Sequence, residues 1–179
     1  MGVSFDSLVS AARRTAEPVR FTPMRTEDID AVMEIERRSF PEPWTPGLFL
    51  HELKVPFSKT ILARRGEEIV GYICRWLVGD EVHILNVAVR PEARQSGIGR
   101  ALVALVMEEA EQSGAGVVTL EVRRENDAAM TLYRAFGFTE RGVRRNYYAR
   151  GQDAVVMSCD LRQASPMPKK PASPSPAHH

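Results

Sequence analysis

The sequence predicts a single mixed α/β domain, in which helices pack against a mostly antiparallel sheet. Apolar, β-branched runs follow one another over residues 58–89 with turns at Gly66 and Gly79, which is the pattern of antiparallel hairpins. The run that ends at Val89 is followed by Pro91, two glycines and apolar residues at helical spacing. Another strand follows this helix, and a crossover of this size predicts that it runs parallel to the strand before the helix.

Length and composition fit one domain with its own core. The chain has 179 residues, 44% of them hydrophobic, and its formal net charge of +1 argues against a broad nucleic-acid-binding surface. No apolar run approaches the ~20 residues that span a membrane, and the N-terminus does not resemble a signal peptide. Cys74 and Cys159 fit buried small side chains in a reducing compartment. We therefore expect a cytoplasmic protein that binds neither membrane nor nucleic acid directly.

The predicted domain spans residues 19–162, between two segments of different composition. Residues 1–18 are interpreted as a short helix or a loose arm, to which no role is assigned. Residues 163–179 are rich in proline, serine and alanine, and such a segment cannot bury enough apolar surface to offset the entropy of ordering it. This tail is predicted to be flexible and extended. The histidines and cysteines lack metal-ligand spacing, so no metal is expected.

In the first part of the domain, a short strand over residues 19–22 precedes two helices. Thr26 is predicted to cap the first helix, which has acidic residues in its first turn and runs to about Phe40. Thr45 followed by Pro46 starts the second helix by a cap-then-proline pattern. Helical spacing predicts that the buried face of the first helix consists of Ile29, Val32, Met33 and Ile35.

The rest of the domain alternates strands and helices. The helix after the glycine loop ends near Gly114 and places its apolar residues inward, and it places Glu108, Glu109 and Glu111 outward. A short helix is predicted over residues 126–136. Strands are predicted over residues 58–64, 69–78, 81–89, 117–122, 138–148 and 153–161.

The loop before the long helix is the most informative stretch of the chain. Glycines there let the backbone approach a ligand closely, and the first-turn N–H groups have no partner within the helix, so the loop fits an anion such as a pyrophosphate. A dinucleotide fingerprint would need a third glycine where Leu102 stands, and a Walker loop would need Gly-Lys-Ser or Gly-Lys-Thr. A helix that merely begins with glycine is the structural alternative.

The loop Arg94-Gln95-Ser96-Gly97-Ile98-Gly99 matches the Gln/Arg-x-x-Gly-x-Gly/Ala motif of the GNAT N-acetyltransferases, and it follows a strand ending Asn-Val-Ala-Val as in that family. Over residues 24–161 the chain most resembles the ribosomal protein alanine N-acetyltransferases of the RimI type. Glu125 departs from that subgroup, which usually has a small residue there. The resemblance implies a GNAT-like sheet whose two central parallel strands splay apart to hold acetyl-coenzyme A. Its further motifs are Leu120-Glu121-Val122-Arg123, Asn126, Leu132-Tyr133, Phe136-Gly137-Phe138 and Arg144-Arg145-Asn146-Tyr147-Tyr148.

For acetyl-CoA, the resemblance implies two binding regions and one further contact. The acetyl and pantetheine arm would lie along the backbone of Val87, Ala88 and Val89, whose side chains serve the core. Asn126 would hydrogen-bond the cofactor. A bulged strand with an unpaired N–H could stabilise the thioester oxyanion. The pyrophosphate would lie at the motif formed by Arg94, Gln95, Ser96, Gly97, Ile98, Gly99 and Arg100.

Acetyl transfer to an amine needs a base for the ammonium group and an acid for the leaving thiolate. Glu121 ends an apolar strand, where desolvation would raise its pKa, and the resemblance makes it the general base. The structural alternative is an ion pair with Arg123 or Arg124. The resemblance makes Tyr133 the acid, and packing is its structural alternative. Asn126 and Tyr133 are two helical turns apart, so they share one helix face.

The peptide-side residues are also predicted from the resemblance. Trp44 either lines the substrate groove or belongs to the core. His51 and His83 are interpreted as structural or surface groups. The strand that contains Arg145, Asn146 and Tyr147 either fixes an extended peptide or is an edge strand with a solvated arginine pair.

The resulting hypothesis is an acetyl-CoA-dependent enzyme that acetylates a protein N-terminus by direct attack on the thioester. The resemblance points to the N-terminal alanine of a small-subunit ribosomal protein, and to a monomer or weak oligomer. Acetylation of a lysine, a polyamine or another small amine is the alternative among enzymes. A non-catalytic acyl-CoA sensor is the alternative outside them, and a nucleotide-binding module comes last.

Overall fold

The computed structural model describes residues 17–162. The predicted tail at residues 163–179 lies outside the described residues, as does nearly all of the predicted N-terminal arm. The described strands and helices lie between Val19 and Asp160. The domain boundaries themselves stay a prediction.

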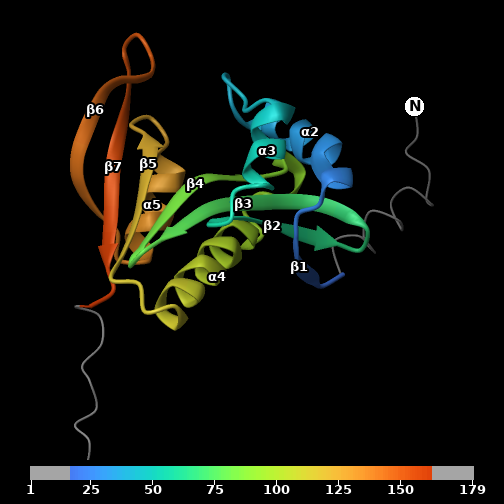
Figure 1. The fold of residues 1–179 in the computed structure, drawn as a ribbon. Coiled ribbons are helices and arrows are strands. Elements are labelled where there is room, and N and C mark those ends of the chain that lie inside the picture. Colours follow the sequence, from blue (N-terminus) through green and yellow to red (C-terminus); the bar gives the residue numbers. More distant parts are fainter. Residues whose placement is uncertain (1–16, 163–179) are drawn as a thin grey trace, which may run out of the picture.

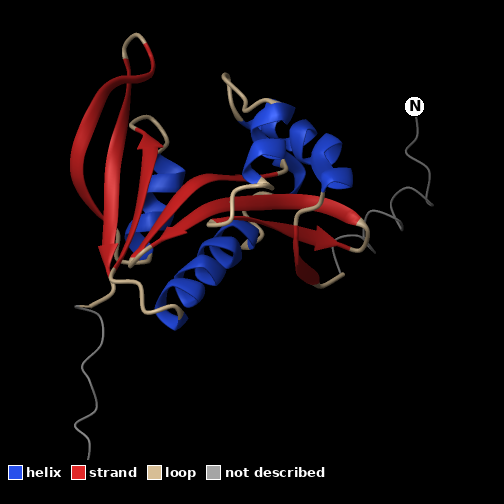
Figure 2. Ribbon diagram, viewed as in Figure 1, coloured by secondary structure: helices blue, strands red, loops and turns tan. Residues whose placement is uncertain are grey.

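One seven-stranded sheet runs through the molecule (Figures 1 and 2). The strand order is β1-β2-β3-β4-β5-β7-β6, and every neighbouring pair is antiparallel except β4 with β5. The predicted mostly antiparallel sheet with one parallel pair is confirmed. The strands are β1 (Val19–Pro23), β2 (Ser58–Arg65), β3 (Glu68–Val78), β4 (Glu81–Val89), β5 (Val117–Arg123), β6 (Thr139–Ala149) and β7 (Gln152–Asp160).

Helices cover both faces of the sheet (Figure 2). On one face, α2 and α3 pack over Leu62, Tyr72 and Ala88 of the first strands. On the other face, α4 and α5 enclose a larger core in which Val106 and Leu120 are almost fully buried. The helices are α2 (Ile29–Ser39), α3 (Pro46–Glu52), α4 (Ile98–Gln112) and α5 (Asp127–Ala135).

The start of the first helix differs from the prediction. Thr26 opens a short 3₁₀ turn that ends at Asp28, and α2 itself begins at Ile29. Asp28, rather than Thr26, fixes this end, because its carboxylate accepts the N–H of Arg25 at 2.9 Å and also pairs with Arg64. The buried face of α2 is as predicted and consists of Ile29, Val32, Met33 and Ile35, with Glu36 in addition.

The prediction for the start of α3 is confirmed, whereas the prediction that Glu109 of α4 faces outward is wrong. Thr45 caps α3 as predicted, since its hydroxyl accepts the N–H of Leu48 at 3.2 Å. Glu109 of α4 is not a solvated outward residue. It is partly buried and accepts hydrogen bonds from Lys59 and from Arg75, the latter at 2.9 Å, because the strands beneath α4 present these cations to it.

Candidate active site

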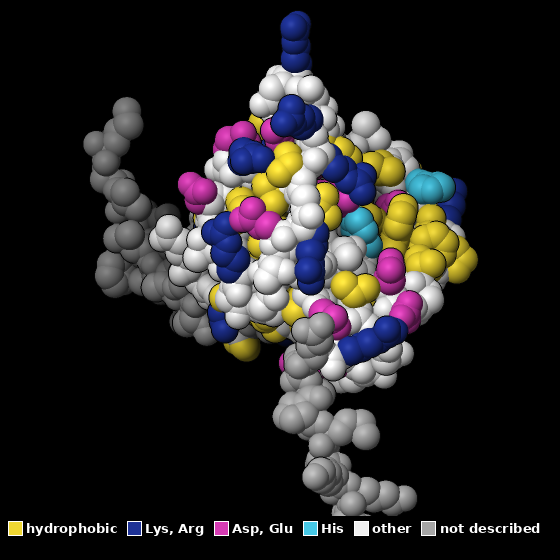
Figure 3. Space-filling view, turned by 90° about the vertical axis from the view of Figure 1, so that its left-hand side faces the viewer, with side chains coloured by type: hydrophobic (Ala, Val, Ile, Leu, Met, Phe, Trp, Pro, Cys, Tyr) yellow, Lys and Arg dark blue, Asp and Glu magenta, His cyan; other side chains and the backbone are white. Residues whose placement is uncertain are grey.

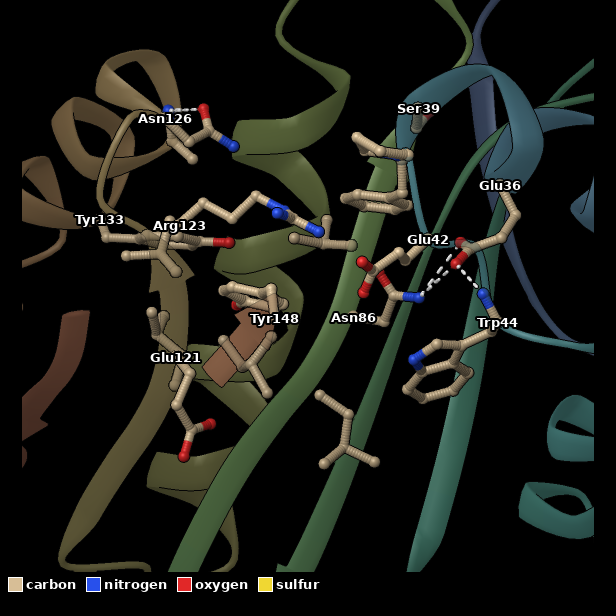
Figure 4. A pocket seen from close by; sticks show the side chains of 18 residues that line it. Glu36, Ser39, Glu42, Trp44, Asn86, Glu121, Arg123, Asn126, Tyr133 and Tyr148 are labelled. Carbon is tan, nitrogen blue, oxygen red and sulfur yellow. Dashed lines mark hydrogen bonds between the residues drawn. The ribbon is translucent and has the colours of Figure 1, made fainter. Parts of the chain in front are cut away.

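The centre of the sheet opens where β4 and β5 separate. Their parallel pairing ends at Ile84 and Leu120, whereas β5 stays paired with β7 as far as Arg123. At the same level β4 has a bulge at Leu85, because the residues on either side of it pair with consecutive residues of β3. The divergence and the bulge open a pocket of about 250 Å³ (Figure 4). The two splayed strands that the family resemblance implied are therefore present.

Two walls line this pocket, on either side of β4 in Figure 4. Leu85, Asn86 and Val87 of β4 line the pocket between these two walls. The α2 wall consists of Glu36, Ser39, Glu42 and Trp44, and the β5 wall consists of Glu121, Arg123, Asn126, Tyr133 and Tyr148.

The segment from Val87 to Val89 has a backbone edge that is not paired with β5. It pairs with β3 along one edge, and its other edge lies beyond the end of the pairing with β5. The side chains are used for packing, since Val87 and Val89 contact the core under α4 and Ala88 is buried under α2. This placement leaves the open backbone edge for the predicted cofactor role, which stays a prediction.

The loop between β4 and α4 has the backbone of an anion site. Gln95 and Gly97 have positive φ angles of 58° and 83°, and α4 begins at Ile98. The N–H groups of its first turn therefore have no acceptor within the helix. The helix dipole adds partial positive charge at the same place.

Side chains of this loop hold it in place. Arg94 donates to the carbonyl oxygen of the last residue of β4 at 2.9 Å and to Oγ of Ser39 at 3.1 Å, so it fastens the loop to β4 and α2. The hydroxyl of Ser96 donates to a carbonyl within the loop. The guanidinium of Arg100 lies 5.2 Å from the centre of the Phe136 ring. Arg94, Ser96 and Arg100, which are predicted cofactor residues, therefore also stabilise the loop through their side-chain contacts.

Glu121 lies on the β5 wall between two partners. Its carboxylate is 2.7 Å from Nε2 of His83 and 3.3 Å from Nη2 of Arg144. The hydrogen bond with His83, with the charge of Arg144, lowers the pKa of the Glu121 carboxyl group although partial burial opposes them. The predicted rise in this pKa is wrong, because desolvation is incomplete and His83 outweighs it. Arg144, rather than Arg123 or Arg124, supplies the ion pair.

His83 belongs to the site, contrary to its interpretation as a structural or surface group. Its Nδ1 lies 3.2 Å from Oγ1 of Thr119, so both ring nitrogens contact polar groups of β5. His83 pairs in register with Thr119, which places Glu121 two residues further along the same face. Strand alternation carries this signal, but it can be used only when the relative register of the two strands is known.

Tyr133 and Asn126 lie at the same part of the β5 wall (Figure 4). The Tyr133 ring packs against Phe138 with ring centroids 5.7 Å apart, and burial raises the pKa of its phenol well above the usual value. Such a phenol stays protonated near neutral pH. Asn126 caps α5, since its Oδ1 accepts the N–H of Ala129 at 3.1 Å, and its amide nitrogen is the remaining donor.

The residues predicted to contact a peptide lie in different places. Trp44 lines the pocket and also packs on Phe49 with ring centroids 5.1 Å apart, so it is partly a core residue, and its predicted contact with a substrate stays a prediction. Arg145, Asn146 and Tyr147 are exposed on β6, outside the pocket lining. The face that carries β6 shows basic and acidic side chains interspersed (Figure 3). The predicted peptide contacts of these three residues stay predictions.

Tyr148 and Arg123 line the pocket where those contacts were expected. The guanidinium of Arg123 lies 4.1 Å from the centre of the Tyr148 ring, and burial raises the pKa of Tyr148 to about 12. Strand alternation could not single out Tyr148, because β6 loses register with β7 between Arg144 and Ala149.

Glu36 is a buried carboxylate that the sequence interpretation overlooked. It accepts hydrogen bonds from the N–H of Trp44 at 2.7 Å, from Nδ2 of Asn86 at 3.1 Å and from the hydroxyl of Tyr72. Burial raises the pKa of its carboxyl group. The sequence held a signal, since Glu36 lies three and four positions after Met33 and Val32 and so shares their buried face.

Within residues 17–162, no three His, Cys, Asp or Glu side chains are placed to hold a metal ion. In the same part of the chain, no helix combines the length and hydropathy needed to cross a bilayer. Cys74 and Cys159 are buried free thiols, as predicted.

A parallel strand pair splays apart, the first turn of a helix offers N–H groups without a helical acceptor, and a carboxylate and a phenol line the pocket where the strands separate. These are features of an enzyme that transfers an acyl group. The profile of the acetyltransferase (GNAT) family matches residues 29–138, and the chain belongs to this family.

Relatives from two bacteria are similar to most of this chain. One relative is a Bacillus subtilis (strain 168) protein that is named as a candidate ribosomal protein bS18-alanine N-acetyltransferase. It is 40% identical over 136 residues, which cover 75% of this chain and 90% of the relative. The ribosomal protein bS18-alanine N-acetyltransferase of Escherichia coli (strain K12) is 33% identical over 141 residues, or 77% of this chain and 95% of its own. The crystal structure of the ribosomal-protein-S18-alanine N-acetyltransferase from Escherichia coli superposes with a TM-score of 0.75 and 30% identity, over 80% of this chain and 94% of that one.

Proposed function

We propose that this protein transfers the acetyl group of acetyl-CoA to the N-terminal α-amino group of a protein, the N-terminal alanine of a small-subunit ribosomal protein. One observation carries the proposal: Glu121 and Tyr133, a carboxylate of lowered pKa and a buried phenol of raised pKa, line one pocket beside the open edge of β4. The relatives named for acetylation of bS18 support the choice of substrate. A ribosomal substrate supports a reaction in the cytoplasm, which is part of this proposal.

Acetyl-CoA fits the two backbone features of the site. Nothing lies within 4 Å of the position where a Cβ on Gly97 would project, so a pyrophosphate has room beside the first turn of α4. The open edge of β4 at Val87–Val89 offers hydrogen bonds to an extended amide chain, as a neighbouring strand would. When bound there, acetyl-CoA supplies an activated thioester, and a β4 N–H beside the bulge can stabilise charge on its carbonyl oxygen.

The β5 wall supplies the two proton movements. Because the pKa of Glu121 is lowered, its carboxylate is ionised at neutral pH and can attract an ammonium group. In Figure 4 it points away from Tyr133, and we infer that it takes the proton through an intervening water. Tyr133 keeps its proton at neutral pH and can donate it to the departing sulfur.

A base of lowered pKa favours an α-amine over a lysine. An α-amino group has an ordinary pKa of about 8 and is roughly 10% neutral at pH 7, whereas a lysine of pKa about 10.4 is neutral well below 1% of the time. A weak base such as Glu121 is therefore better matched to the α-amino group of a peptide, whose proton is easier to remove than that of a lysine ammonium group. Trp44 of the α2 wall and Tyr148 of the β5 wall both line the pocket, and we infer that the peptide N-terminus enters between these walls.

The test measures turnover of acetyl-CoA with two matched peptides, and the release of the coenzyme A thiol reports the turnover. The first begins Ala-Arg with a free N-terminus, and the second has the same sequence with a blocked N-terminus and an internal lysine. We expect turnover on the first peptide alone. Turnover on the blocked peptide would move the assignment to lysine acetylation. Turnover on polyamines alone, or binding of acetyl-CoA with no turnover, would favour a small-amine enzyme or a cofactor sensor respectively.

A further inference from the structure

Strand β6 is interrupted where it passes the active site. Arg144 pairs with Ala154 of β7, and the next pair is Ala149 with Gln152. Residues 145–148 therefore stand opposite Asp153 alone and form an extended bulge. The β6–β7 hairpin continues beyond the end of β5 in this region (Figure 1).

Asn146 is bonded to the residues across this bulge. Its φ angle is 54°, in the left-handed region that asparagine adopts more readily than most residues. Its Oδ1 accepts the N–H of Gly151 at 2.6 Å, and its own N–H donates to Oδ1 of Asp153 at 3.0 Å. Both bonds cross the hairpin, so together they set the shape of the bulge.

The two ends of the bulge carry groups that touch the β5 wall. Arg144 precedes the bulge and lies 3.3 Å from the carboxylate of Glu121. Tyr148 is its last residue, lines the pocket and lies against Arg123 at 4.1 Å (Figure 4). A regular strand would alternate its side chains between the two faces of the sheet, so the bulge decides where Tyr148 points.

We propose that Asn146 is a positioning residue, which shapes the peptide side of the active site by holding the bulge that presents Tyr148 and Arg144 to β5. The inference rests on the proposed function only for the identity of the substrate. Asn146 acts through the loop and not by touching the peptide, because its Oδ1 is already bonded to Gly151 and its side chain lies outside the pocket lining.

Three substitutions separate positioning from direct contact. Asn146→Asp keeps the Oδ1 acceptor and tolerates positive φ, Asn146→Gly keeps the backbone freedom alone, and Asn146→Ala loses both. We expect Asn146→Asp to stay within about twofold of wild type. Asn146→Ala is expected to raise KM for the peptide about tenfold, the equivalent of one hydrogen bond of about 1.4 kcal/mol, with KM for acetyl-CoA almost unchanged. Asn146→Gly should fall between them.

A direct contact between Asn146 and the peptide predicts different kinetics from a positioning role. A direct contact through the amide nitrogen would make Asn146→Asp as defective as Asn146→Ala, because both lack that donor. Wild-type values in all three variants would remove any role for the residue. Unchanged KM for acetyl-CoA shows that each variant is folded.

A second measurement does not depend on any substrate. The ring current of Tyr148 shifts the proton resonances of the Arg123 side chain, since the guanidinium lies 4.1 Å from the ring centre. We expect this NMR shift to persist in Asn146→Asp and to be lost in Asn146→Ala. A shift that persists in Asn146→Ala would refute the positioning role even if the proposed substrate were wrong. If the wild-type enzyme did not acetylate the Ala-Arg peptide but the NMR shifts behaved as expected, the proposed function would be refuted and the positioning role of Asn146 would stand.

Discussion

The glycine loop, residues 94–100, and the β5 wall are two candidate parts of the site that are built differently. The β5 wall lines the pocket, whereas the loop lies outside the pocket lining. The loop is continuous in sequence and presents backbone N–H groups, whose directions depend on the positive φ angles of Gln95 and Gly97. The β5 wall collects side chains from β5, α5 and β6, and its carboxylate depends on His83 of β4 and Arg144 of β6. A backbone site is sensitive to φ, whereas a side-chain site is sensitive to single atoms and to distant elements.

The largest effect is expected on the β5 wall, from loss of one atom. Tyr133→Phe removes the proton donor and keeps the buried ring against Phe138. We expect kcat to fall about 10²–10⁴-fold with KM for acetyl-CoA little changed, because general acid catalysis typically contributes this much. Steady-state kinetics on the Ala-Arg peptide measures it, and a melting curve close to wild type excludes unfolding. A loss below threefold would mean that Tyr133 only packs.

A smaller and different effect is expected in the glycine loop. Gly97→Ala places a Cβ in open space, so its cost is the strain of a positive φ, about 1–2 kcal/mol. If the loop then relaxes, KM for acetyl-CoA rises about 5–30-fold while kcat at saturation is largely kept. The matched control is Gly114→Ala at the other end of α4, where φ is 75° and space is also open. Equal KM values in the two variants would contradict binding at the loop.

His83, the hydrogen-bond partner of Glu121, should control how the activity depends on pH. His83 lowers the pKa of Glu121, so His83→Ala is expected to raise this pKa and to shift the acid limb of the kcat profile to higher pH. On that limb, below about pH 4.5, the variant should therefore keep a smaller fraction of its maximal activity than wild type keeps of its own. His51→Ala, an exposed histidine on α3, is the control. An unmoved acid limb would show that Glu121 does not set it.

The smallest effect is expected at Glu36, which joins the α2 wall to β4. Burial raises its pKa, so the folded state binds this proton more tightly than the unfolded state, and the stability it gives is fullest below about pH 4.5 and is lost as pH rises through the raised pKa. Glu36→Gln does not titrate. The unfolding free energy of wild type minus that of Glu36→Gln should therefore fall as the pH rises from about 4 to about 8.

Urea denaturation across that pH range measures this difference. Glu140→Gln, which removes an exposed carboxylate paired with Arg134, is the control for a group at the surface. A constant difference between wild type and Glu36→Gln would show that Glu36 keeps an ordinary pKa.

The sequence by itself determined the features that depend on neighbouring residues. Hairpins at Gly66 and Gly79, the cap at Thr45 and the turn at Gly97 before α4 each follow from a few adjacent residues, because turns, caps and positive φ are local properties. The parallel pairing of β4 with β5 also followed, since a helix of that length allows little else. Thr26 was the local error, because Asp28 gained a second partner, Arg64, from a distant strand.

Only the tertiary structure decided the charge and the side-chain partners in the pocket. The pKa of Glu121 is lowered because strand register brings His83 beside it, and because Arg144 reaches it from β6. Tyr148 enters the pocket because a bulge in β6 breaks the alternation of the strand. Electrostatic and packing effects act over distances in space, and residues far apart in sequence come within those distances only after the strands have paired.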